Sequence, residues 1–267
     1  MTQKVKKNLN AYAKYLSQKK LQASSYKTYL WHIEKFLADL GDKALNVNQL
    51  KKYQSELFGK YHRVASLNLR LVILNDYLHY QKINWQFPLL SNEKQTIEVL
   101  DKNQLNKLLN LANKKSDLCS LRDQVLIEFL YFSGLKTKEI VELKKEDINL
   151  KKNILLWQNK NIAIPNQSKM ALLKYLNHRL DDSAYLFLNF DRAKKTTAKE
   201  NKLSIRSVER ILEKYAHKFQ PILRITPQTL RHTLAYHLKK DGADVASIQK
   251  ALHFQTQLAA EAYYQKL

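Results

Sequence analysis

The stretch of residues 226–264 constrains the fold most tightly, because its breakers and apolar spacing predict three helices in succession. Pro227 suits the first turn of a helix, where its fixed φ and missing N–H cost little. Gly242 can adopt the left-handed conformation that ends many helices, so the first helix should cover residues 227–240. Apolar residues at helical spacing then predict a second helix over residues 244–252 and a short third helix at the end of the stretch.

The order of functional side chains along this stretch is an Arg-His pair, a helical hairpin, a His with an adjacent aromatic, and a Tyr. It resembles the carboxy-terminal motif of the tyrosine recombinases, the Xer and phage integrase family. That family's pattern is His-x-x-Arg-His, a helix ending in Gly-Ala-Asp, then Leu-Gly-His or Leu-Gly-Trp, and finally the nucleophilic Tyr. The match runs without a gap through QTLRH at 228–232, Gly-Ala-Asp at 242–244, Leu-His-Phe at 252–254 and Tyr263.

The resemblance implies a role for most of these positions. Tyr263 takes the place of the nucleophile, and the adjacent Tyr264 is the alternative candidate for that role. Arg231 takes the place of the residue that binds the two non-bridging phosphate oxygens. His253 stands in the family's Gly position and Phe254 in its His or Trp position. Because Phe254 has no donor for a phosphate, His253 could substitute for it.

Two further positions depart from the family pattern. Gln228 stands where the family has a His, and it can donate a hydrogen bond but cannot shuttle a proton at neutral pH. Residues 131–148 resemble the family's Gly-Leu-Arg-x-x-Glu-Leu segment, and Lys136 takes the place of the first catalytic Arg. Lys keeps the charge but lacks the planar fork that binds two phosphate oxygens. Such a donor can be worth about 2.7–4 kcal/mol in a transition state, so the exchange should lower the rate.

Residues 153–165 predict a β-hairpin, because apolar residues that include Leu156 alternate around a turn at residues 159–161. In the family, a Lys on such a hairpin protonates the leaving 5′-oxygen of the DNA. Lys160 is the Lys at this turn, so the resemblance assigns the role of general acid to it. A Lys at a hairpin tip is otherwise typical of a solvated surface position.

The rest of the chain predicts a protein that is mainly α. Residues 8–82 indicate four helices by their apolar spacing, and residues 84–98 break that pattern as a linker does. The expected domains are therefore residues 1–90 and residues 91–267. The resemblance implies that the first is a four-helix core-binding domain that clasps DNA. It implies that the second is an α-rich catalytic domain with a small antiparallel β-hairpin or sheet.

Polar residues near the expected helix starts predict individual helix caps, because their side chains can accept from free N–H groups of the first turn. Ser24 or Ser25 should cap the second helix of the amino-terminal domain, and Asn48 should cap the third. Asp101 should cap the first helix after the linker. His232 and His237, by contrast, lie inside the helix of residues 227–240 and are typical of packing residues.

The formal net charge of +22 indicates a polyanionic partner or, more plainly, a Lys-rich solvated surface. Residues 1–90 hold 15 Lys and Arg against 5 Asp and Glu, and residues 91–267 hold 31 against 19, so both predicted domains are basic. The resemblance favours double-stranded DNA as the partner. The candidate phosphate contacts of the first domain are Lys27, Lys35, Arg63 and Arg70.

Other features bear on compartment and cofactors. No apolar run is long enough to span a bilayer, and no apolar signal-peptide core follows the first lysines, so we expect a cytoplasmic protein with no membrane partner. The single Cys119 cannot form an internal disulfide and is typical of a small core residue. No carboxylate–His cluster has the spacing of metal ligands, so we expect neither a metal nor a cofactor.

Three functions stay open on the sequence alone. The first is a site-specific recombinase or integrase that cleaves and rejoins duplex DNA through a 3′-phosphotyrosine, with activity reduced by Lys136, Gln228 and Phe254. It would act as a homo-oligomer or together with another recombinase on DNA. The second is a DNA-binding or architectural protein that keeps the DNA-clasping fold of the family but no longer cleaves DNA strands. The third, RNA binding, rests on charge alone.

Overall fold

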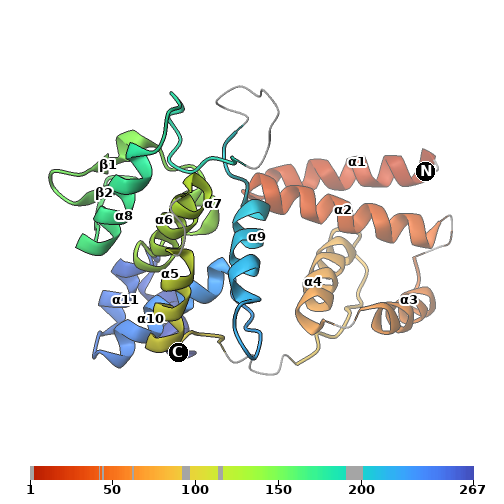
Figure 1. The fold of residues 1–267 in the computed structure, drawn as a ribbon. Helices are drawn as coiled ribbons and strands as arrows, with labels where there is room; N and C mark the ends of the chain where they lie inside the picture. The colour runs from red at the N-terminus through yellow and green to blue at the C-terminus, as the bar shows by residue number, and fades with distance from the viewer. Residues whose placement is uncertain are drawn as a thin grey trace. The chain divides into compact units, whose positions relative to one another are not determined.

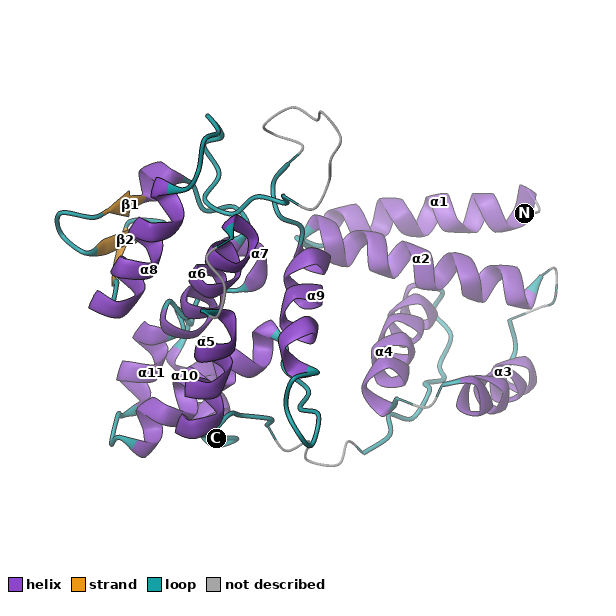
Figure 2. Ribbon diagram, in the orientation of Figure 1, coloured by secondary structure: helices purple, strands orange, loops and turns teal. Residues whose placement is uncertain are grey.

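The computed structural model describes residues 3–41, 43, 45–61, 63–91, 97–113, 117–190 and 201–267. The chain divides into two compact units, Met1–Gln95 and Thr96–Leu267, which are described here one after the other (Figure 1). Helices dominate both units, and the described strands belong to the second (Figure 2). The predicted fold class, mainly α with a small antiparallel β element, is confirmed. Among the described helices, none combines the length and the apolar character needed to cross a membrane.

The first unit contains α1 (Gln3–Gln18), α2 (Ala23–Leu40), α3 (Val47–Lys60) and α4 (Val64–Tyr80). An aromatic cluster lies at its centre, where Tyr12, Phe36 and Tyr77 are fully buried. Tyr77 meets the other two rings edge to face, with centroids 5.0 Å and 6.1 Å away. Such pairs contribute about 0.5–1.5 kcal/mol each beyond the area they bury, so this cluster ties three helices together.

Two of the predicted helix caps in this unit are wrong by two or three residues. α2 begins at Ala23 without a side-chain cap, so neither Ser24 nor Ser25 serves as one. α3 is capped by the side chain of Asn46 rather than by Asn48, which lies inside the first turn. Polar residues are common in first turns as well as at caps, so a sequence with several of them leaves the start ambiguous.

The second unit contains the remaining elements, which are α5 (Lys102–Ala112), α6 (Leu118–Phe132), α7 (Thr137–Ile140), η1 (Lys145–Asp147), β1 (Ile148–Asn149), β2 (Ile154–Trp157), β3 (Lys160–Ala163), α8 (Asn166–Asn177), α9 (Ile205–Ala216), α10 (Pro227–Lys240), α11 (Val245–Ala251) and α12 (Gln257–Tyr264). Its centre is α6, because residues 120–130 are all buried and α5, α8 and α10 pack against it. Asp101 caps α5 through the backbone N–H of Gln104, as predicted.

The three strands form an antiparallel sheet in the order β1-β2-β3, and the predicted hairpin is its β2–β3 pair. The turn consists of Gln158 and Asn159, whose φ angles are 47° and 63°. Two left-handed residues in a row are typical of the tight turn that joins twisted strands. Lys160 pairs with Trp157 and opens β3, so the predicted turn at 159–161 is wrong by one residue.

This register decides which residues of β2 face the core. Leu155 is fully buried and lies opposite Ile162, whereas Leu156 is 42% exposed. Because successive side chains of a strand point to opposite faces, Leu155 faces the core and Leu156 points away from it.

The carboxy-terminal helices follow the boundaries that the sequence predicts. α10 begins at Pro227 after Thr226, whose side chain accepts from Thr229 N–H. Gly242 follows its end with φ at 91°, in the left-handed region where glycine is favoured. α12 then packs on α10 and α11, around a small core that includes Leu234 and Ile248.

A close backbone approach joins the end of α6 to the end of α11. Gly134 has φ at 63°, and a Cβ added to it would lie 1.9 Å from the carbonyl oxygen of Ala251. No side chain fits at that distance, so the approach depends on glycine. It brings the segment that begins with Gly134 beside the segment that begins with Leu252.

We expect Gly134→Ala to destabilise the second unit by about 2–5 kcal/mol. Left-handed strain accounts for about 1–2 kcal/mol and overpacking for about 1–3 kcal/mol. Gly242→Ala is the matched control, because its φ is also positive but, chain neighbours aside, no atom of the described residues lies within 4 Å of the added Cβ. It should lose only the strain, about 1–2 kcal/mol. Urea unfolding measures both, and equal losses would contradict the close approach.

Candidate functional site

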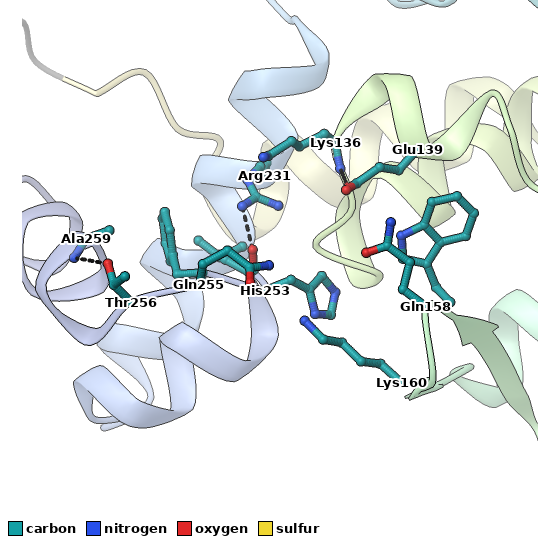
Figure 3. Close-up of a pocket in the computed structure, with 12 residues that line it drawn as sticks. Lys136, Glu139, Gln158, Lys160, Arg231, His253, Gln255, Thr256 and Ala259 are labelled. Atoms are coloured by element: carbon teal, nitrogen blue, oxygen red, sulfur yellow. Dashed lines mark hydrogen bonds between the residues drawn. The ribbon is translucent and has the colours of Figure 1, made fainter. Parts of the chain in front are cut away.

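A pocket of about 260 Å³ lies where four segments of the second unit meet: the start of α7, the β2–β3 hairpin, α10, and the segment from the end of α11 into α12 (Figure 3). Its lining residues are Lys136, Glu139, Trp157, Gln158, Lys160, Arg231, Leu252, His253, Phe254, Gln255, Thr256 and Ala259. Five of the seven predicted catalytic residues are among them, and Gln228 and Tyr263 are not. The pocket therefore brings together residues up to 123 positions apart in the chain.

Three cationic side chains line this pocket, and they come from three different elements. Lys136 precedes α7 and is exposed, Lys160 opens β3 and is exposed, and Arg231 lies on α10 and is 6% exposed. Figure 3 shows the three arranged around one hollow. Glu139 is the acidic residue in the lining, and its Oε2 accepts from the backbone N–H of Lys136 at 2.7 Å. The excess of positive charge suits an anion such as a phosphodiester.

Arg231 is the buried member of this set. Its two terminal nitrogens donate to backbone carbonyls, Nη1 to Gly134 and Nη2 to Leu252 at 2.6 Å. Burial lowers the pKa of the guanidinium, and the nearby Tyr263 and Glu139 oppose that shift. An arginine has five N–H donors, so these two contacts leave others for a ligand in the pocket.

Tyr263 lies beside the pocket rather than in its wall. Its ring stacks on His232 with centroids 5.4 Å apart, and its hydroxyl is hydrogen-bonded to His232 Nδ1. It also contacts Phe254, with ring centroids 5.2 Å apart, and the Arg231 guanidinium lies 5.7 Å from the same Phe254 ring. Burial raises the pKa of Tyr263 to about 12, against the opposing charge of Arg231.

The side chains of Gln228 and His253 have different surroundings. Gln228 is exposed on α10, with its amide nitrogen 3.1 Å from His232 Nε2. His253 has φ at 55°, and its Nε2 lies 2.9 Å from the carbonyl oxygen of Ser133. Because a carbonyl only accepts, that nitrogen carries the proton. Burial lowers the pKa of His253, so its ring is neutral, and its buried Nδ1 has no hydrogen-bond partner among the residues that the structure describes.

Sequence reasoning missed two side chains of this region. His232 was expected to be a packing residue, but it also holds the hydroxyl of Tyr263. Trp157 was not singled out; it lines the pocket, and within the described part of the chain its buried indole N–H has no hydrogen-bond partner. The position of His232 next to Arg231 was a sequence signal for its role. Trp157 had no such signal, because its place depends on the one-residue shift of the hairpin turn.

The candidate phosphate contacts of the first unit differ in exposure. Lys27 and Lys35 on α2 and Arg63 before α4 are exposed. Arg70 is 4% exposed and donates to the hydroxyls of Tyr53 and Tyr61, so its guanidinium is engaged inside the unit instead of being presented to a ligand. In the described ranges of the chain, no group of three or more His, Cys, Asp and Glu is placed to hold a metal ion.

We expect Arg231→Lys to destabilise the second unit by about 1–3 kcal/mol, because one ammonium in place of the fork leaves a buried carbonyl without its donor. Lys136→Met is the control, since Lys136 is exposed and a surface substitution is usually within about 0.5 kcal/mol of neutral. Urea unfolding compares the two. If both variants unfold at the same denaturant concentration, Arg231 does not hold the two segments together.

Comparisons with known proteins place these residues in a family. Residues 98–267 match the model of the phage integrase family. The chain is 29% identical over 253 residues to tyrosine recombinase XerA of Pyrococcus furiosus, covering 91% of this chain and 84% of that protein. It is also 29% identical over 257 residues to a putative tyrosine recombinase of Caldanaerobacter subterraneus, covering 89% of this chain and 85% of that protein.

Two solved structures share the fold. The Tn1549 transposon integrase in complex with circular intermediate DNA superimposes with a TM-score of 0.74 at 15% identity, covering 96% of this chain and 94% of that chain. The XerH site-specific recombinase bound to a palindromic difH substrate gives 0.69 at 18% identity, covering 90% and 76%. With a family model that matches well over half of its residues, the chain belongs to the phage integrase family of tyrosine recombinases.

Proposed function

We propose that this protein is a site-specific recombinase that cleaves and rejoins duplex DNA through a covalent 3′-phosphotyrosine at Tyr263. The observation that carries the proposal is the convergence of Lys136, Lys160 and Arg231 on one pocket, with Tyr263 packed beside it. The names of the relatives and the DNA in the similar structures support the same substrate class.

In the proposed reaction, Arg231 and Lys136 bind the non-bridging oxygens of the scissile phosphate. The Tyr263 oxygen attacks the phosphorus, and the bond to the 5′-oxygen breaks. Lys160 gives its proton to that leaving oxygen. Rejoining runs the same steps backwards, so the phosphodiester energy is kept in the phosphotyrosine bond.

Duplex DNA would also contact the first unit in this proposal. The exposed Lys27, Lys35 and Arg63 supply its phosphate contacts, and Arg70 does not, because its guanidinium is buried against two tyrosines. Binding through several lysines and arginines releases counterions and should weaken steeply with salt. Assembly with a second copy or another recombinase would bring two cleavage sites together, as strand exchange requires.

Tyr263→Phe should abolish the covalent protein–DNA adduct while leaving DNA binding unchanged. A duplex with a nick just beyond the cleavage site traps the adduct, because the short cut fragment diffuses away before it can be rejoined. Gel electrophoresis under denaturing conditions then measures the trapped fraction.

Tyr264→Phe is the matched control for that experiment, because the two tyrosines are neighbours on α12. It should form the adduct at close to the rate of the unchanged protein. If the unchanged protein binds duplex DNA in a salt-sensitive way but forms no adduct, the second hypothesis is favoured, in which the protein binds DNA without cleaving it. An adduct that survives Tyr263→Phe but not Tyr264→Phe would move the nucleophile by one residue.

Lys136→Arg should raise the rate of adduct formation, by up to about 10²-fold. The fork adds a second directed donor to the phosphate, and one such donor is worth about 10²–10³ in rate. Adding Gln228→His and Phe254→His to Lys136→Arg should raise the rate further. Single-turnover kinetics on the nicked duplex measure each step of the series, and no gain at any step would contradict the idea that these three residues weaken the site.

A further inference from the structure

His232 lies between Gln228 and Tyr263, and polar contacts link the three side chains. Its Nδ1 is hydrogen-bonded to the Tyr263 hydroxyl, and its Nε2 lies 3.1 Å from the Gln228 amide nitrogen. The imidazole and phenol planes are 22° apart, so the rings stack while their polar atoms meet. A contact to the nucleophile's own oxygen is more than packing requires.

We propose that His232 Nδ1 takes the proton of Tyr263 when the phenol oxygen attacks the phosphate, and returns it when the strand is rejoined. This inference rests on the proposed function, because it assigns the base of that same reaction. Such a base is needed because burial raises the pKa of Tyr263 to about 12, which leaves the phenol almost wholly protonated at neutral pH.

The electrostatic surroundings keep the imidazole of His232 in its neutral form. Burial lowers the pKa of its imidazole, and the neighbouring Arg231 charge lowers it further, so the ring is neutral before DNA binds. Arg231 on the same helix and Tyr263 on α12 are the charged and titratable groups that face the ring in the described structure. A bound phosphodiester brings a negative charge beside Arg231, which offsets the repulsion that an imidazolium would meet.

Gln228 selects the tautomer of this imidazole. With its amide nitrogen donating to Nε2, the ring proton sits on Nδ1 and His232 donates to the Tyr263 oxygen. A half-turn of the exposed amide presents its oxygen instead, which holds the ring proton on Nε2 and leaves Nδ1 free to accept. Gln228 is thus a positioning residue, because it acts on the reaction through His232.

The proton and electron balance of the step is complete without a co-reactant. The Tyr263 oxygen forms the bond to phosphorus and its proton moves to His232 Nδ1. The bond from phosphorus to the 5′-oxygen breaks, and that oxygen receives a proton from Lys160 Nζ. His232 ends cationic and Lys160 neutral, and rejoining restores both.

A duplex whose leaving 5′-oxygen is replaced by sulfur separates the base from the acid, because a thiolate leaves without being protonated. With this substrate, Lys160→Ala should cleave at close to the rate of the unchanged protein. His232→Phe, which keeps the ring stack, should stay about 10²–10⁴-fold slow with oxygen and with sulfur alike. Melting curves of the variants confirm that each is folded.

His232→Asn and the pH profile separate proton transfer from positioning, because an amide can hold the hydroxyl but cannot take its proton. The unchanged protein should level off in rate above the pKa of His232, which lies below the usual 6.5, and slow as pH falls through it. The Asn variant should instead gain about tenfold per pH unit towards the pKa of Tyr263.

Each result of these experiments decides the inference. Slow His232→Phe and His232→Asn cleavage on both substrates, with the altered pH profile, supports it. A normal rate in His232→Phe, rescue of that variant by sulfur, or full activity in His232→Asn with the original pH profile overturns it while the proposed function stands. Absence of any adduct in the unchanged protein overturns both.

Discussion

The site depends on the hydrogen bonds that the buried Arg231 guanidinium donates to the carbonyls of Gly134 and Leu252. One carbonyl belongs to the segment that leads to Lys136, and the other to the segment that carries His253 and Phe254. Leaving such carbonyls without a donor in the interior costs about 1–3 kcal/mol each, so the guanidinium fixes both segments against α10. The same group faces the pocket, and it therefore holds the walls together and supplies part of their charge.

A close backbone contact joins the same two segments that the Arg231 hydrogen bonds hold. The approach of Gly134 to Ala251 leaves no room for a side chain, and the bond from His253 to the Ser133 carbonyl joins the same two segments once more. These contacts leave little freedom in the spacing between Lys136 and the start of α12. The phosphate site that we propose needs such fixed geometry, because electrostatic stabilisation works best when its donors are in place before the charge develops.

The three residues that we predict to depart from the family pattern have different surroundings in the structure. Lys136 is exposed and lines the pocket. Phe254 fills the space between the ring of Tyr263 and the guanidinium of Arg231, and it contributes packing where a donor would otherwise stand. Gln228 is placed against His232, so its amide acts on the neighbouring imidazole. In the reaction that we propose, His232 rather than residue 228 is therefore the proton acceptor.

The sequence by itself determined the helices whose ends carry their own chemical signals. The Thr226-Pro227 start, the Gly242 end and the Asp101 cap act through contacts within one turn, which is why local reasoning found them. It missed the hairpin register and the cap at Asn46, where neighbouring residues of similar type compete and only pairing or packing chooses among them. Tertiary structure alone decided that Arg70 turns inward to two tyrosines and that the Tyr263 hydroxyl rests on His232. Those contacts join residues from different segments of the chain, and no spacing along a chain encodes which side chains meet once the helices pack.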